Sequence, residues 1–199
     1  MNPRGRLITI EGIDGAGKTT LAERLLTALP GARMLREPGG VAVAERVRSL
    51  VKDPALHVDP RAEALLYAAA RAQLVHERLL PLLESGTDVL LDRFVDSSLA
   101  YQGAGRGLGV HEIAELNRFA TAGIAPDRTL YLRVPPEVGA ARRSGEDRLE
   151  REAETFFAAV VDAYDAIARA EPDRVVVIDG TRSPDDVLAD ALHAVEDLR

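Results

Sequence analysis

The residues with the clearest chemistry form a glycine-rich loop that ends in lysine and threonine. Gly12, Gly17, Lys18 and Thr19 match the pattern G-x-x-x-x-G-K-[ST], within the stretch EGIDGAGKTT. Glycines let backbone N–H groups turn toward an anion, the lysine reaches the β- and γ-phosphates, and the threonine hydroxyl binds Mg2+. The loop therefore predicts a site for a nucleoside triphosphate with magnesium. It does not choose between a GTPase switch, a motor ATPase and a small-molecule kinase.

Three further segments carry side chains that suit a second ligand. REPGG places Arg36 beside a glycine-rich turn, either as an anion contact or as a surface arginine. Tyr67 and Arg71 are four residues apart and share a helix face, either as a base-stacking pair or as a core tyrosine with an arginine that reaches the surface. Asp92 and Arg93 close an apolar run, and ligands bind at the carboxyl ends of parallel strands.

The elements that must position these residues alternate along the chain. Short apolar runs predict strands at 6–12, 32–37, 87–92, 128–134 and 174–180. Helical patterns predict helices at 18–29, 43–51, 59–85, 111–122, 152–170 and 184–198, with Asp59 as an N-cap and a kink at Pro81. This alternation predicts an α/β fold with a parallel sheet covered on both faces. No linker divides residues 1–199, so we expect a single domain, with the polar segment at about 141–152 as a lid.

Composition limits the partners and the compartment. The chain has 199 residues, a net charge of −7 and no cysteine. The charge argues against a nucleic-acid polymer, because that binding needs a basic face. No apolar stretch reaches the length of a membrane span, and the apolar run near the N-terminus is too short for a signal peptide. We therefore expect no membrane association and a cytoplasmic location, with which the lack of cysteine is compatible.

The segments together resemble one family. The loop, REPGG, YAAARAQ, DR…S..AYQG and DR.E occur in the order and spacing of thymidylate kinases, from Leu7 to about Glu150 and weakly beyond. The resemblance implies a P-loop NTPase fold, with a five-stranded parallel sheet, helices on both faces and a short lid. It implies that ATP donates its γ-phosphoryl group to dTMP, giving dTDP, with Mg2+ as cofactor and a homodimer as the assembly. The alternatives are a deoxynucleoside kinase and a non-catalytic nucleotide-binding regulator. The segments REPGG and AYQG argue against the kinase of a deoxynucleoside. A regulator of the GTPase-switch type would carry an Asn-Lys-x-Asp motif that binds guanine, and the sequence has none.

The resemblance also assigns residues. It implies that ATP is bound by the whole loop, namely Gly12, Ile13, Asp14, Gly15, Ala16, Gly17, Lys18, Thr19 and Thr20. In the family, the residue at Asp14 contacts the sugar 3′-hydroxyl, Arg36 and Arg93 hold the acceptor phosphate, and Tyr101 crowds the 2′ position. Tyr67 would stack on thymine, and the remaining base contacts would be Arg71, Ser98 and Gln102. The metal would be held by Thr19 and Asp92, with help from Glu37.

Catalysis by electrostatics is the last implication. Lys18 and Arg93 would act with an arginine from the lid, since Gly15 stands where some members carry a loop arginine. The candidates are Arg142, Arg143 and Arg148, and the lid looks a few residues shorter than usual, so the sequence does not choose among them. No general base is required, because the second pKa of a phosphate monoester is near 6.

Overall fold

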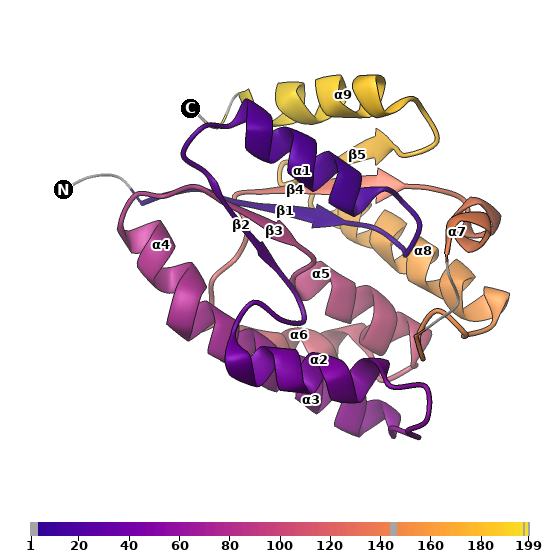
Figure 1. Cartoon of the computed structure of the whole chain (residues 1–199). Coiled ribbons are helices and arrows are strands. Elements are labelled where there is room, and N and C mark those ends of the chain that lie inside the picture. The colour runs from indigo at the N-terminus through magenta and orange to yellow at the C-terminus, as the bar shows by residue number, and fades with distance from the viewer. Residues whose placement is uncertain (1–3, 144–146, 197, 199) are drawn as a thin grey trace.

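Five parallel strands form the centre of the molecule (Figure 1). The computed structural model describes residues 4–143, 147–196 and 198. The strands are β1 (Leu7–Glu11), β2 (Arg33–Arg36), β3 (Val89–Asp92), β4 (Arg128–Arg133) and β5 (Val175–Asp179). They lie in the order β2-β3-β1-β4-β5, and every neighbouring pair is parallel. All five residues of β1 are buried, as an apolar run in the middle of a two-sided sheet must be.

Helices cover both faces of the sheet, as predicted (Figure 1). The first face carries α1 (Lys18–Ala28) and α9 (Pro184–Glu196), which contact each other. The second carries the helices between β2 and β5, including α2 (Ala42–Lys52), α3 (Pro60–Leu74), α6 (Val110–Ala120) and α8 (Glu154–Ala170). For the helices that connect two strands, this division follows from right-handed crossovers, because the chain steps one way from β1 to β2 and the other way from β2 to β5.

The long helix that begins after Asp59 has an unexpected middle. The Asp59 side chain accepts a hydrogen bond from the Arg61 N–H at 2.9 Å, so the predicted N-cap is confirmed. In place of a simple proline kink, a π-helical segment, η1 (Val75–Leu79), separates α3 from α4 (Leu80–Glu84). Leu80 donates its N–H to Val75, five residues back. The wider turn falls just before Pro81, which has no N–H and would clash with a carbonyl in a regular helix.

Two further helical segments had no counterpart among the predicted elements. One comprises α5 (Val95–Ser98) and the π-helical η2 (Leu99–Gly105), directly after β3. The other is α7 (Pro136–Arg142), at the start of the predicted lid. Both follow strand ends and carry few apolar residues at helical spacing, so periodicity does not reveal them. Among the described residues, no helix combines the length and the apolar character that crossing a membrane requires.

Candidate active site

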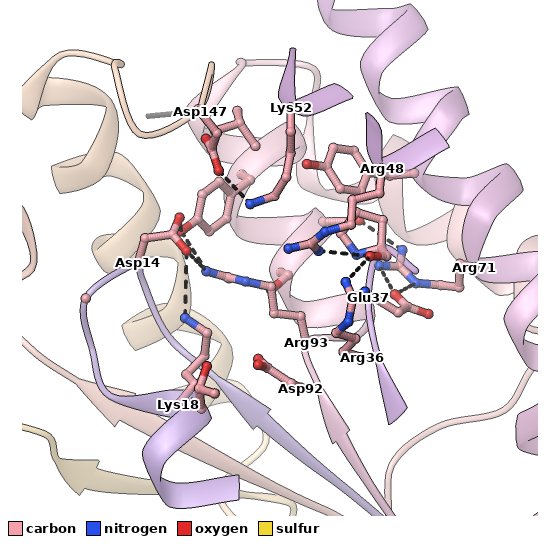
Figure 2. A pocket seen from close by; sticks show the side chains of 18 of the residues that line it. Asp14, Lys18, Arg36, Glu37, Arg48, Lys52, Arg71, Asp92, Arg93 and Asp147 are labelled. Carbon is pink, nitrogen blue, oxygen red and sulfur yellow. Dashed lines mark hydrogen bonds and ion pairs between the residues drawn. The ribbon is translucent and has the colours of Figure 1, made fainter. Parts of the chain in front are cut away.

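A cavity of about 500 Å3 lies at the carboxyl edge of the sheet. Figure 2 shows its side chains converging from the loop after β1, the ends of β2 and β3, and the helices α2 and α3. Sixteen of the residues singled out from the sequence line this one cavity: Asp14, Gly15, Gly17, Lys18, Thr19, Thr20, Arg36, Glu37, Tyr67, Arg71, Asp92, Arg93, Ser98, Tyr101, Gln102 and Arg142. Gly12, Ile13 and Ala16 belong to the loop but do not border the cavity, and neither do Arg143 and Arg148.

The loop has a backbone that excludes a side chain at position 15. Gly15 has a φ of 82°, in the left-handed region that favours glycine. A Cβ there would lie 2.5 Å from the Gly139 carbonyl oxygen and 3.1 Å from the Cβ of Arg142. Position 15 therefore cannot carry an arginine in this backbone, and α7 brings Arg142 to the space beside it.

Lys18 is buried at the first turn of α1, directly after the loop. Its Nζ donates to the Ile13 carbonyl at 2.9 Å and lies 4.0 Å from Asp14 Oδ1. Burial and the nearby Arg93 guanidinium lower the pKa of Lys18 to about 8. The positive end of α1 points at the same place, so this part of the cavity suits an anion.

Arg93 connects the end of β3 to the loop (Figure 2). Its guanidinium donates to Asp14 Oδ1 at 2.6 Å, and to the Gly12 carbonyl and Ser97 Oγ at 3.0 Å each. The Tyr101 hydroxyl donates to Asp14 Oδ2 at 3.2 Å. Burial alone would raise the pKa of Asp14, but the Arg93 and Lys18 charges outweigh it and lower the pKa. Asp14 is therefore an ionised acceptor between the two cations.

Arg71 is held rigidly under the cavity. It is only 2% exposed, and its N–H groups donate to Glu37, Ser98, the Phe94 carbonyl and Asn117. The Glu37–Arg71 pair is 2.6 Å long, and burial nevertheless raises the pKa of Glu37 to about 7. Because these acceptors occupy the guanidinium, a ligand carbonyl that contacts Arg71 must share or replace one of them.

Two cations on α2 were not identified from the sequence. Arg48 donates to the Pro38 carbonyl at 2.9 Å, and Lys52 pairs with Asp147 at 2.5 Å. Both line the cavity, beside Arg36, which pairs with Glu45 at 2.7 Å (Figure 2). Arg48 and Lys52 are four residues apart and so share a helix face, the same signal that singled out Tyr67 and Arg71.

The three candidate lid arginines lie in different surroundings. Arg142 borders the cavity and donates to the carbonyls of Gly15 at 3.4 Å and Gly180 at 3.2 Å. Arg143 stacks on Phe157, with its guanidinium carbon 3.6 Å from the ring centroid. Arg148 pairs with Glu63 at 2.5 Å. Residues 144–146 of the predicted lid lie outside the described residues.

The predicted metal ligands fit magnesium. Asp92 Oδ1 is buried and has no hydrogen-bond partner, and Thr19 borders the same cavity. In the described part of the chain, no group of three or more His, Asp or Glu side chains could hold a metal ion. Mg2+ usually binds through one or two carboxylates together with substrate phosphates, so an unpartnered carboxylate oxygen and a hydroxyl that line the same cavity are a suitable set.

Fold and site together define a class. A phosphate loop with a buried lysine faces a second, arginine-rich half of one cavity, at the carboxyl edge of a parallel sheet. This arrangement is that of a P-loop phosphotransferase with a small phosphorylated acceptor.

Comparison with known proteins narrows the class. A family model described as "Thymidylate kinase" matches residues 10–191. A curated thymidylate kinase from Lactobacillus delbrueckii subsp. bulgaricus is 46% identical over 204 residues, which cover 97% of this chain and 96% of the relative. One from Halalkalibacterium halodurans is 46% identical over 203 residues, with 97% of each chain covered. A crystal structure of thymidylate kinase from Ehrlichia chaffeensis has a TM-score of 0.79 and 30% identity, and covers 98% of this chain and 100% of that chain. The chain belongs to the thymidylate kinase family.

Proposed function

We propose that the protein transfers the γ-phosphoryl group of ATP to dTMP, giving dTDP. Membership of the family supports this activity. The observation that carries it is the single cavity that joins Lys18 of the phosphate loop to the cations Arg36, Arg48 and Arg93. Two polyanions can meet there, because positive charge lies on both sides of the point of transfer.

On the donor side, the loop residues 12–20 bind the triphosphate. Lys18 neutralises the β- and γ-phosphates, and the first turn of α1 adds its N–H groups. Thr19 and Asp92 would hold Mg2+, which would supply positive charge against the phosphates of ATP. Arg142 completes this side, because of the three lid candidates it alone borders the cavity.

On the acceptor side, Arg36, Arg48 and Arg93 hold the phosphate of dTMP. Asp14 accepts from the 3′-hydroxyl, and its charge repels a nucleotide that carries a phosphate there. The base lies between Tyr67 and the polar group formed by Arg71, Ser98 and Gln102, and Tyr101 crowds the 2′ position. These roles rest on the resemblance and on the shared cavity.

The chemistry then needs alignment more than proton transfer. The acceptor oxygen of dTMP is already ionised at pH 7, because the second pKa of the phosphate is near 6. The chain holds the two phosphates in line, neutralises them with lysine and arginine, and excludes water that would otherwise accept the phosphoryl group.

An acceptor panel tests the function. The protein is mixed with Mg-ATP and either dTMP, dUMP, AMP or thymidine, and ADP release is followed. We expect dTMP to be preferred, with dUMP worse by the value of one methyl group, about 1–3 kcal/mol. A preference for AMP contradicts the proposal, and a preference for thymidine assigns the chain to the deoxynucleoside kinases instead. Lys18→Met is the matched inactive control.

We also propose a homodimer, formed through the helices α2, α3 and α6. α3 contacts both α2 and α6 (Figure 1), and the three helices carry the exposed apolar side chains Val43, Leu50, Leu65 and Phe119, the last of which is 89% exposed. Apolar side chains gathered on adjoining helices are typical of an interface. Sedimentation should give a dimer for the wild type and a monomer for Phe119→Glu; a monomeric wild type contradicts the proposal.

A cytoplasmic location and the exclusion of nucleic-acid polymers stay predictions from composition.

A further inference from the structure

Glu63 has a completely buried carboxylate that none of the assigned roles uses. Its side chain on α3 is 0% exposed. The carboxylate accepts from Gln102 at 2.9 Å, from Arg148 at 2.5 Å and from Arg106 at 3.0 and 3.2 Å. Burial favours the neutral acid, but hydrogen bonds from Arg106, Gln102 and Arg148 outweigh it and lower the pKa of Glu63. Three different segments therefore meet at one charged group.

One of these segments is the described end of the lid, 147–152. Arg148 also donates its N–H to the Lys52 carbonyl at 3.2 Å and its Nε to the Val51 carbonyl at 3.0 Å. Asp147 pairs with Lys52, and Glu152 pairs with Arg106 at 2.6 Å. Asp147 and Arg148 thus attach this part of the lid to α2 and α3, the helices on the acceptor side, and Figure 2 shows the contact between Asp147 and Lys52.

A second partner of Glu63, Gln102, lies on the base side of the cavity. Glu63, Tyr67 and Arg71 are four residues apart, so they follow one face of α3. Gln102, which lines the cavity, donates its Nε2 to Glu63 Oε1. This contact fixes the orientation of the Gln102 amide and leaves the carbonyl oxygen Oε1 as the acceptor for a ligand.

We propose that Glu63 is a positioning residue that fixes the Gln102 amide for a base with a ring N–H and ties the end of the lid to that base site. The proposal rests on the proposed function, since it concerns the dTMP half of the cavity. Thymine carries an N–H at N3, which a carbonyl oxygen accepts. Cytosine carries a bare acceptor at that position, so the fixed amide rejects it.

The consequence for the lid follows from the same carboxylate. A base held against Tyr67 and Gln102 restrains the side chains around Glu63, and Glu63 restrains Arg148. Binding of dTMP alone, without ATP, therefore holds residues 147–152 in place. Arg148 acts here as an anchor of the lid, at a distance from the phosphates.

The test compares two variants of the full-length chain that remove different contacts of Glu63. Its contact with Gln102 is called the base arm, and its contact with Arg148 is called the lid arm. Glu63→Gln removes the charge that fixes both arms, whereas Arg148→Gln leaves the contact between Glu63 and Gln102 intact. The matched control is Glu154→Gln, at an exposed position at the start of α8. Two quantities are measured: the ratio of kcat/KM for dTMP to that for dCMP, and the slowing of amide exchange at residues 147–152 by dTMP alone.

We expect Glu63→Gln to lower the dTMP/dCMP ratio about ten-fold, the effect of losing one charge-assisted hydrogen bond, and to abolish the slowing of exchange. Arg148→Gln should abolish the slowing but keep the ratio, and the control should keep both. Thermal unfolding of each variant establishes that it folds. If Glu63→Gln does not fold, Arg148→Gln still tests the lid arm through amide exchange. Gln102→Glu then tests the amide through the dTMP/dCMP ratio. Two results would overturn the inference and leave the function standing, provided that the wild type phosphorylates dTMP. One is an unchanged dTMP/dCMP ratio in Glu63→Gln or Gln102→Glu. The other is unchanged slowing of amide exchange by dTMP in Arg148→Gln. A wild type inactive on dTMP overturns the function first.

Discussion

Arg93 Nη2 lies 2.6 Å from Asp14 Oδ1, which joins the end of β3 to the phosphate loop. Arg93 holds a φ of 68°, a left-handed conformation that costs a non-glycine residue about 1–3 kcal/mol. Its contacts with Asp14, Gly12 and Ser97 hold it in that conformation. One guanidinium thus borders the donor and acceptor halves of the cavity at once.

Replacing Asp14 by Asn should weaken use of dTMP. The variant keeps the shape of the side chain but loses the charge that pairs with Arg93 and accepts from the sugar. We expect kcat/KM for dTMP to fall about ten- to hundred-fold, the value of a hydrogen bond to a charged group. The KM for ATP should change much less. Steady-state kinetics measure both, with Asp190→Asn, in a surface pair on α9, as control. Unchanged dTMP turnover would show that the sugar assignment is wrong.

The charge of Lys18 makes ATP binding depend on pH. In the free protein its pKa is lowered to about 8, because burial and Arg93 oppose the charged form. Bound phosphates need the charged lysine, so above pH 8 binding should take up a proton, and affinity should fall as the pH rises. Calorimetry at pH 7 and 9, in buffers of different ionisation enthalpy, measures this uptake. Equal heats in both buffers at pH 9 would contradict it.

The lowered pKa of Lys18 also makes the free energy of unfolding depend on pH. Between about pH 8 and the ordinary lysine pKa of 10.5, the unfolded chain binds a proton at Lys18 that the folded chain lacks. The contribution of Lys18 to the free energy of unfolding therefore increases with pH in this window. Denaturant unfolding of the wild type and Lys18→Met across the window should give a difference in the free energy of unfolding that changes in favour of the wild type as the pH rises; a difference that does not change with pH would contradict this.

Loss of the Asp92 charge should raise the magnesium requirement. The Asp92 Oδ1 atom is buried without a partner in the cavity, a costly state that a cation would relieve. We expect Asp92→Asn to need a higher Mg2+ concentration for half-maximal rate, while binding of ATP without Mg2+ stays unchanged. A magnesium titration of the rate checks this, and an identical midpoint in the variant would remove Asp92 from the metal site.

Much of this arrangement could be predicted from the sequence, for local reasons. The loop pattern and the apolar runs reflect backbone requirements that are set within each segment. The sheet, and the position of Arg93 at its carboxyl edge, were therefore predicted correctly. The partners of Glu63 are different, because Gln102, Arg106 and Arg148 are 39 to 85 residues away and meet it only in the folded chain. The surroundings of the lid arginines likewise depend on tertiary packing: Arg142 and Arg143 depend on where α7 packs, and Arg148 depends on its contacts with α2 and α3. Arg48 could have been identified from the sequence, because it shares a helix face with Lys52.

The lid arginines should separate by the quantity that each variant changes. Arg142 borders the cavity beside Gly15, so Arg142→Ala should lower kcat by a hundred-fold or more, since an arginine at a transferring phosphoryl group is worth about 10³–10⁵ in rate. Arg143 stacks on Phe157, so Arg143→Ala should lower the melting temperature, by the loss of a contact worth about 1–2 kcal/mol, and spare kcat. Arg148→Ala should act through the lid anchor, and it should lower the melting temperature too, because it removes a partner of the buried Glu63 carboxylate. Steady-state kinetics and thermal unfolding on the same preparations measure both quantities. A loss of kcat in Arg143→Ala that equals the loss in Arg142→Ala would mean that Arg143 leaves Phe157 during turnover, and the assignment of the lid arginine would pass to it.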